Sequence, residues 1–348
     1  MMHRALPVAL SIASGLALAA RAQETPTPPT FGTAVETVYL DVFVGEDGKP
    51  VEGLTVESFQ VKDNGVRQQV ELVSAEQVPL RVILAFDVSG NLAGAGLAQL
   101  QKAGQGLLAA LAPEERADLL TFSHELRRAP GRSPAELQSA LAAVQAGGAT
   151  ALYDAAFAAL ALAEGRETRP IVILFSDGKD VQSLLDADAV YETARLSAAT
   201  VYTVHTQEEG PARLTATAGT PAAPPSRDMQ AHDAYDLGNR GPRGNTNERF
   251  EAASRAAVPR GVTDLPEAPR FLARLAEETG GRTFAVGVPD MEATFREILH
   301  DARTRYLLRY DPSGVDQAGW HEVDVKLPGR PAEVRARKGY FRPEASGG

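Results

Sequence analysis

The chain has 348 residues, of which 44% are apolar and 23% are charged, and its formal net charge is −10 at pH 7. This length accommodates two domains, or one domain with a large insertion, and the composition is that of a globular protein. The negative charge argues against nucleic acid or an anionic membrane surface as a general partner. Cysteine is absent from the sequence, which excludes disulfides, zinc–thiolate sites and a lipid-anchoring cysteine.

Residues 1–22 have the layout of a secretory signal peptide. A basic Arg4 precedes an apolar stretch at 5–20, and the tripeptide at 20–22 (ARA) is a small-x-small cleavage site. The apolar stretch is short for a bilayer span, although an uncleaved membrane anchor is the alternative. We therefore expect an exported protein, periplasmic or extracellular, with no membrane span after cleavage and a net charge of −12, two positive charges fewer.

The segment after the signal peptide predicts a linker and then a small β unit. Residues 23–34 are rich in Pro and Thr and are typical of a linker. From 35 to 78 the chain alternates between apolar and polar residues, and Asp47-Gly48 and Asn64-Gly65 separate the strand-like runs. These turn dipeptides predict antiparallel hairpins. We expect the charged side chains of this unit on the solvent-facing side of a sheet.

Strand-like and helix-like patterns alternate over 79–305. Strands are predicted at 82–87, 118–123, 170–176, 201–205 and 282–286, with a short edge strand at 124–129. Helices are predicted at 95–111, 133–144, 151–164, 183–199, 268–279 and 289–303. Ser133 and Glu136 have the spacing of a capping box at the start of the second helix. This alternation predicts an α/β domain with a doubly wound, mostly parallel sheet.

Residues 207–268 interrupt this domain with a stretch dense in Pro, Gly, Ala and Arg, which predicts a partly disordered insertion. The insertion is predicted to begin at the same sheet edge as Asp87. It could serve as a lid or a recognition loop over that edge, or it could be a solvated spacer. Alternation returns at 306–343, which predicts a C-terminal β unit that pairs with the N-terminal one in a small β-sandwich. Its basic residues are predicted to form a solvated edge: Arg330, Arg335, Arg337, Lys338 and Arg342.

Three loops at the predicted carboxyl edge of the sheet contain oxygen-bearing side chains. The first contains Asp87, Ser89 and Asn91, the second Thr150, and the third Asp177. Ligands of open α/β sheets bind at this edge, and hard cations prefer oxygen ligands. The loops therefore predict a Mg²⁺ site, with Mn²⁺ as the alternative metal. Taken singly, Thr150 could instead be a helix N-cap, and Asp87 and Asp177 could be caps or acceptors for turn amides.

These loops resemble the von Willebrand factor A (VWFA) domain family. The metal-ion-dependent adhesion site (MIDAS) of that family combines an Asp-x-Ser-x-Ser loop, a Thr and an Asp, which Asp87, Ser89, Thr150 and Asp177 match in order. The phrases GGATALYDA and ILFSDGKD also look like those of the family, and the likeness covers roughly 79–305. The whole arrangement is similar to that of exported acidobacterial VWFA-related proteins. The segments that carry this similarity are VYLDVFV, the Asp-x-Ser-Gly loop and VRARKGYF.

The chain departs from the family motif at Asn91, which stands where the family has its second Ser. An amide oxygen ligates hard cations, but the side chain is longer than that of Ser and requires the loop to shift. The resemblance implies that Ser89 and Thr150 coordinate the metal directly, while Asp87 and Asp177 act largely through water.

The function that the resemblance implies is non-enzymatic binding, in which an exposed Asp or Glu of a partner protein completes the metal coordination. The alternative is a metal-independent interaction or scaffold protein with a degenerate MIDAS. A secreted hydrolase is the third class, and the sequence offers it no nucleophile–base pair, no Walker loop and no Gly-x-Ser-x-Gly elbow.

Overall fold

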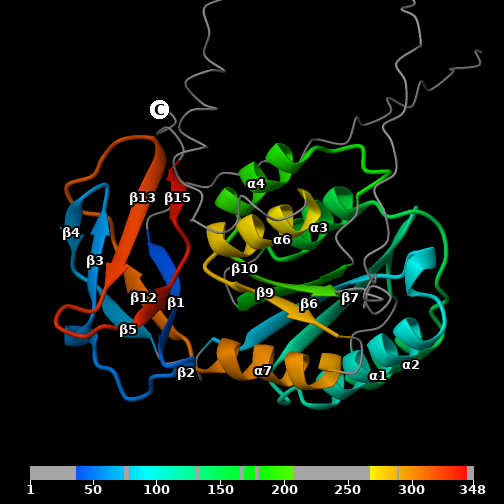
Figure 1. Cartoon of the computed structure of the whole chain (residues 1–348). Helices are drawn as coiled ribbons and strands as arrows, with labels where there is room; N and C mark the ends of the chain where they lie inside the picture. Colours follow the sequence, from blue (N-terminus) through cyan, green and yellow to red (C-terminus); the bar gives the residue numbers. More distant parts are fainter. Residues whose placement is uncertain are drawn as a thin grey trace, which may run out of the picture. The chain divides into compact units, whose positions relative to one another are not determined.

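The computed structural model describes residues 37–73, 78–129, 133–164, 168–176, 180–206, 267–287 and 290–342. The predicted signal peptide, the linker, most of the predicted insertion and Asp177 lie outside these residues. The described residues form an α/β part and a pair of antiparallel sheets (Figure 1). The predicted fold class, a doubly wound α/β sheet flanked by a small β-sandwich, is therefore confirmed.

The α/β part is built on a six-stranded sheet in the order β11-β10-β9-β6-β7-β8. Its strands are β6 (Leu80–Asp87), β7 (Arg116–Phe122), β8 (Leu126–Arg128), β9 (Arg169–Ser176), β10 (Thr200–Thr206) and β11 (Arg282–Val286). Neighbours are parallel except for the pair β7 and β8. The chain builds outward from β6 to one edge and then from β9 to the other. The winding of the sheet therefore reverses between β6 and β9.

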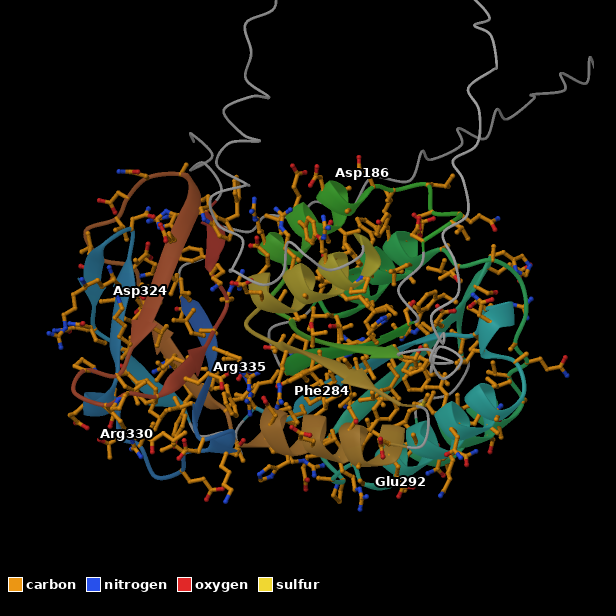
Figure 2. All side chains as sticks on the ribbon, in the orientation of Figure 1. Asp186, Phe284, Glu292, Asp324, Arg330 and Arg335 are labelled. Atoms are coloured by element: carbon orange, nitrogen blue, oxygen red, sulfur yellow. The ribbon has the colours of Figure 1, made fainter. Side chains whose placement is uncertain are left out.

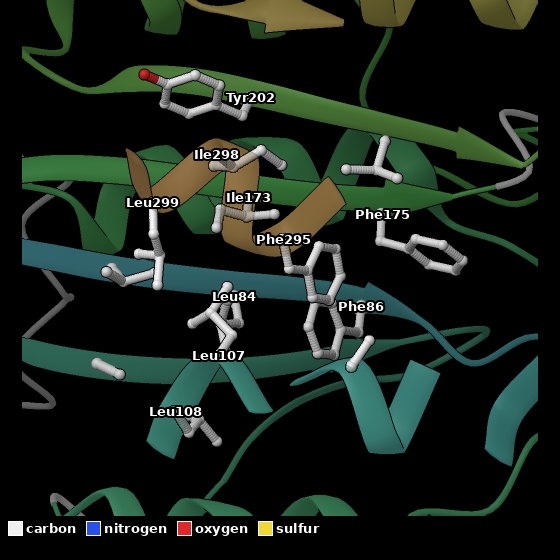
Figure 3. Close-up of a cluster of buried hydrophobic side chains, with 14 of the residues drawn as sticks. Leu84, Phe86, Leu107, Leu108, Ile173, Phe175, Tyr202, Phe295, Ile298 and Leu299 are labelled. Carbon is white, nitrogen blue, oxygen red and sulfur yellow. The ribbon is translucent and has the colours of Figure 1, made fainter. Parts of the chain in front are cut away.

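Helices cover both faces of this sheet (Figure 1). One face is covered by α1 (Ala95–Ala109), α2 (Pro134–Ala142) and α7 (Met291–Arg303), and the other by α3 (Leu152–Leu162), α4 (Ala187–Leu196) and α6 (Glu267–Glu278). Figure 3 shows the core on the first face, where the ring of Phe86 stacks on Phe295 with centroids 5.6 Å apart. Phe175 meets Phe86 edge-on at 6.3 Å. Since rings from β6, β9 and α7 interlock here, the ends of the two central strands have fixed positions.

Helix α2 begins with the capping box that the sequence predicts. The Ser133 hydroxyl accepts a hydrogen bond from the Glu136 N–H at 3.3 Å, and the Glu136 carboxylate accepts one from the Ser133 N–H at 3.0 Å. We expect Ser133→Ala to lower the free energy of unfolding by about 1 kcal/mol, because a first-turn N–H loses its acceptor. Urea unfolding followed by circular dichroism would measure this loss. Ser133→Asp and Ser139→Ala, the latter on the exposed side of the same helix, should remain close to the wild type. An equal loss in Ser139→Ala would contradict the capping role.

The β-sandwich combines strands from both ends of the described chain. Its strands are β1 (Val38–Glu46), β2 (Lys49–Pro50), β3 (Gln60–Asp63), β4 (Val66–Gln68), β5 (Glu71–Val73), β12 (Tyr306–Tyr310), β13 (Gly319–Lys326), β14 (Glu333–Arg335) and β15 (Gly339–Arg342). One sheet has the order β14-β1-β12-β5, with β2 beside β1, and the other has the order β15-β13-β3-β4. The predicted turns are present. Asp47 and Gly48 have φ angles of 49° and 75°, and Asn64 and Gly65 have φ angles of 45° and 82°. These left-handed conformations favour such residues in tight hairpins.

Two predictions about charged side chains of the sandwich are wrong. Asp63 is fully buried, and Asp41 is largely buried against Arg169 and Arg305 instead of facing solvent. Arg335, predicted on a solvated edge, donates a hydrogen bond to Asp301 at 2.6 Å. The alternation of apolar and polar residues in a strand predicts only the side of the sheet to which a side chain points. It cannot predict that a partner of opposite charge lies on that side.

Candidate metal site

The predicted site lies where the winding of the α/β sheet reverses. Asp87 ends β6 and Ser176 ends the neighbouring strand β9, so the two residues lie side by side. The Ser176 hydroxyl donates a hydrogen bond to Asp87 Oδ2 at 2.8 Å, and the residues are 0% and 2% exposed. The Asp87 carboxylate is therefore fixed at the switch point of an open α/β sheet, which is the usual place for a ligand.

The loop that follows Asp87 folds back on its carboxylate. The Ser89 N–H donates to Asp87 Oδ1 at 2.9 Å, so Asp87 does serve as an acceptor for a turn amide, one of its two structural alternatives. Ser89 is 3% exposed, and its hydroxyl makes no hydrogen bond to the described residues. Asn91 lies in the short 3-10 turn Gly90–Leu92 and is exposed. Asn91 therefore stands on the outer side of the loop.

The loop that contains Thr150 is fastened to the Asp87 loop by two main-chain hydrogen bonds. The Gly147 N–H donates to the Val88 carbonyl at 2.8 Å, and the Gly90 N–H donates to the Gly148 carbonyl at 3.0 Å. Gly148 has a φ of +83°, and a Cβ at this position would lie 1.9 Å from Nδ1 of His124. A glycine is required there by both the backbone conformation and the close approach of this imidazole.

Thr150 is not the N-cap of α3. The N-cap residue is Ala151, and the Leu152 N–H instead donates to Asp180 Oδ1 at 2.7 Å. Thr150 is 3% exposed, its hydroxyl has no hydrogen-bond partner in the described part of the chain, and its carbonyl accepts from the Val181 N–H at 3.0 Å. The structure thus removes the helix-capping alternative for Thr150, and no described residue is hydrogen-bonded to its hydroxyl.

Three residues that shape the site, Asp180, Ser183 and His124, were not predicted from the sequence. Asp180 holds the first turn of α3 and accepts from the Ser183 hydroxyl at 2.5 Å, and Ser183 Oγ accepts from the Tyr153 N–H at 3.0 Å. His124 packs against Gly148 and has a half-exposed side chain. Asp180 lies in the phrase that suggested Asp177, but capping of a helix by a loop from another part of the chain has no local signal. The position of His124 likewise depends on tertiary structure.

The residues present fit a hard cation. Asp87, Ser89 and Thr150 supply only oxygen atoms, the chemistry preferred by Mg²⁺ and Mn²⁺. Two of the three side chains are hydroxyls in nearly buried residues that lack a protein partner among the residues described. No group of three or more His, Cys, Asp or Glu in the described ranges is arranged to hold a metal. Among the described residues, the candidate ligands are therefore the Asp87 carboxylate and the two neutral hydroxyls.

Solved structures to which the chain is similar include a VWFA protein. A von Willebrand factor type A protein from Catenulispora acidiphila is 12% identical, with a TM-score of 0.44 over 89% of this chain and 74% of that one. An aerotolerance-related membrane protein from Bacteroides fragilis is 13% identical, with a TM-score of 0.41 over 64% of this chain and 98% of that one. Proximal thread matrix protein 1 from the mussel byssus, with a zinc-occupied MIDAS motif, is 11% identical, with a TM-score of 0.44 over 68% and 49% of the two chains.

Neither a protein-family model nor a curated protein matches the chain. Within the described ranges, every helix is too short or too polar to cross a membrane.

Proposed function

We propose that this chain is an exported, non-enzymatic binding protein that recognises a partner protein through a Mg²⁺ held at the carboxyl ends of β6 and β9. The observation that supports it is the pair of hydroxyls of Ser89 and Thr150. They have no hydrogen-bond partner among the described residues, and they lie on two loops that are hydrogen-bonded to each other beside Asp87. Ser89 and Thr150 would ligate the cation directly, and Asp87 and Asp177 would hold its coordinated water. Bound Mg²⁺ supplies an open coordination position, which a carboxylate of the partner fills.

Asp87 and the loops around the cation would have different roles in this binding. Because the Asp87 carboxylate is already oriented by the Ser89 N–H and the Ser176 hydroxyl, little rearrangement of that side chain is needed on binding. The surrounding loops would contact the partner next to its Asp or Glu and so determine which partner is accepted. Export is supported by the signal-peptide layout of residues 1–22.

Calorimetric titration with Mg²⁺, and in parallel with Mn²⁺, tests this proposal. We expect saturable binding to the wild type and a weakening by about tenfold or more in Thr150→Val, since even an outer-shell partner of a metal commonly contributes that much. Thr150→Val is a suitable variant because the hydroxyl it removes has no partner among the described residues. Ser139→Ala removes a hydroxyl from an exposed position of α2 and should bind Mg²⁺ as the wild type does.

Absence of both binding heat and a metal-induced thermal shift in the wild type would contradict the proposal. That result would support the alternative, a metal-independent interaction or scaffold protein with a degenerate MIDAS. Asn91 favours this alternative, since it replaces a hydroxyl of the family motif and is exposed in the structure. Asn91→Ser should then restore Mg²⁺ binding if this substitution alone makes the site degenerate.

A further inference from the structure

In the part of the chain that the structure describes, strand β13 has a free edge at its C-terminal end, beyond Val323. Its first half, up to Glu322, pairs with β15, whereas Val323–Lys326 pairs with β3 on the opposite side (Figure 1). The Val323 N–H donates to the Lys338 carbonyl at 2.9 Å, which is the last hydrogen bond of β13 toward β15. Main-chain groups of every second residue face the same side of an antiparallel strand. The N–H and C=O of Val325 therefore face this side, and no described residue forms a hydrogen bond with them there.

The edge is free because the segment before β15 belongs to the other sheet, where β14 pairs with β1. If the ladder of β13 and β15 continued, Ala336 would come opposite Val325. Instead, Arg335 already pairs with Phe43 of β1 in the second sheet. A groove of about 560 Å³ opens between the two segments, lined by Val325 and Ala336 among others. We call it the β13 groove, and its volume lies in the range of about 300–1,000 Å³ that is typical of ligand sites.

Basic side chains dominate the lining of the β13 groove. Its charged residues are Lys62, Lys326, Arg337, Lys338, Glu322 and Asp324. Lys326 is paired with Asp324 at 2.7 Å, and Lys338 with Glu277 at 3.2 Å. Figure 2 shows Asp324 on β13 and Arg335 on the segment that runs toward β15. Two cations, Lys62 and Arg337, make no ion pair with any described residue.

Arg337 is distinct from the arginines around it. Its Nε donates to the Gly339 carbonyl at 2.6 Å and its Nη2 to the Arg195 carbonyl at 2.9 Å, so only main-chain oxygens orient it. Its neighbour Arg335, by contrast, is paired with Asp301. Burial lowers the pKa of Arg337 to about 10. A carboxylate from another molecule would supply the counter-charge that this guanidinium lacks in the described part of the chain.

We propose that the β13 groove binds an extended acidic segment of a partner protein. The segment adds to the free edge of β13 through main-chain hydrogen bonds with Val325, and it places one carboxylate on Arg337 and another near Lys62. This is strand addition, in which main-chain bonds supply affinity and alternate side chains supply specificity. An acidic peptide fits better than a nucleic acid, because Glu322 and Asp324 on the same wall would repel a continuous phosphate backbone.

Fluorescence anisotropy of a labelled heptapeptide tests the proposal. The peptide alternates threonine and glutamate with blocked termini and is titrated with the full chain in EDTA, which keeps any cation site from taking its carboxylates. We expect saturable binding, no binding of the lysine counterpart, and a loss of about tenfold in Lys62→Glu and in Arg337→Gln, as for one charge-assisted hydrogen bond. Lys49→Glu makes the same charge change on β2, outside the lining of the groove, and should bind normally.

A peptide N-methylated at successive residues tests the main-chain bonds separately, and it should not bind because neither edge of its strand can donate. Failure of the unmodified peptide to bind, or equal binding of the lysine peptide, would overturn the proposal. Equal binding of the N-methylated peptide, or an unchanged affinity in Lys62→Glu, would overturn it as well. Thermal unfolding of Arg337→Gln shows whether its lost main-chain bonds disturb the fold. Lys62→Glu carries the test if they do, since no bond of Lys62 within the described residues is lost.

Discussion

Replacing Arg305 by methionine is expected to lower the free energy of unfolding by about 3–5 kcal/mol, the usual cost of removing one partner of a buried ion pair. The Arg305 side chain is 0% exposed, and its Nε donates to Asp41 Oδ1 at 3.0 Å. Its Nη1 lies 3.4 Å from Asp301 Oδ1, and its Nη2 donates to the Gly280 carbonyl at 2.8 Å. Methionine fills much of the same space. The expected loss of stability therefore arises because the buried carboxylates of Asp41 and Asp301 each lose a partner.

The cluster around Arg305 joins β1 of the sandwich to the α/β part. Asp41 on β1 also accepts a hydrogen bond from Nη2 of Arg169, the first residue of β9, at 3.0 Å. Asp301 on α7 accepts from the Tyr202 hydroxyl at 2.6 Å and from Arg335. Every charge in the cluster has a partner of opposite sign, a condition under which buried charges are tolerated. Loss of Arg305 therefore weakens several elements together.

Urea unfolding of the wild type, Arg305→Met and Arg309→Met would measure this effect. Arg309 lies four residues further along on β12 and forms an exposed ion pair with Glu71 at 2.6 Å. Exposed pairs contribute little to stability because water and salt screen them, so the Arg309 variant should unfold almost as the wild type does. If the two variants were equally stable, the buried cluster would not have the importance assigned to it.

The stability difference between the wild type and Arg305→Met is expected to depend on pH. Burial by itself would raise the pKa of Asp41, but Arg169 and Arg305 outweigh it and hold this pKa below the usual range. A carboxyl with a lowered folded-state pKa stabilises the protein above its ordinary pKa of about 4, and this stabilisation is lost as the pH falls through the folded-state value. Without Arg305, the pKa of Asp41 moves upward. The stability difference between wild type and variant should therefore narrow as the pH is lowered below about 4.

Features with a short-range cause could be predicted from the sequence. The Asn64-Gly65 hairpin and the capping box of Ser133 depend on residues no more than three positions apart. The strands and helices of the α/β part follow from apolar periodicity, and their order implies the sheet. The edge at which Asp87 and Thr150 meet follows from the rule that parallel strands end on the same side. These inferences use only the local pattern and the direction of the strands.

Features that depend on distant partners could not be predicted in the same way. Asp41 and Asp63 follow the alternation of ordinary strands, and only the fold brings Arg305 and His321 to them. Thr150 has the position of a helix cap, but Asp180 from another loop takes that role. In each case a polar residue obeys a local rule, and its environment is determined by a segment far away in the sequence. Such residues are therefore the ones for which local patterns mislead.

Replacing Asp63 by leucine is expected to lower the free energy of unfolding by about 3–5 kcal/mol, because each buried donor left without an acceptor costs about 1–3 kcal/mol. Asp63 is fully buried and accepts hydrogen bonds from the hydroxyls of Tyr340 at 2.7 Å and Tyr310 at 3.0 Å. His321 Nδ1 lies 2.8 Å from Asp63 Oδ1, and His321 Nε2 donates to a carbonyl. Leucine branches at the same carbon as aspartate, but it is larger and accepts no hydrogen bond, so the two tyrosine hydroxyls lose their acceptor and His321 loses its contact with the carboxylate.

Tyr340→Phe provides the decisive comparison for this cluster, with urea unfolding as the measurement. Removing a donor together with its acceptor leaves fewer unsatisfied groups than removing the acceptor alone. The double variant Asp63→Leu with Tyr340→Phe should therefore lose less stability than the sum of the two single variants. Asp324→Leu, at a half-exposed position of the neighbouring strand β13, serves as the control and should remain near the wild type. Strict additivity would mean that Asp63 stabilises the sandwich by packing, whereas a smaller combined loss would assign its contribution to the hydrogen bonds.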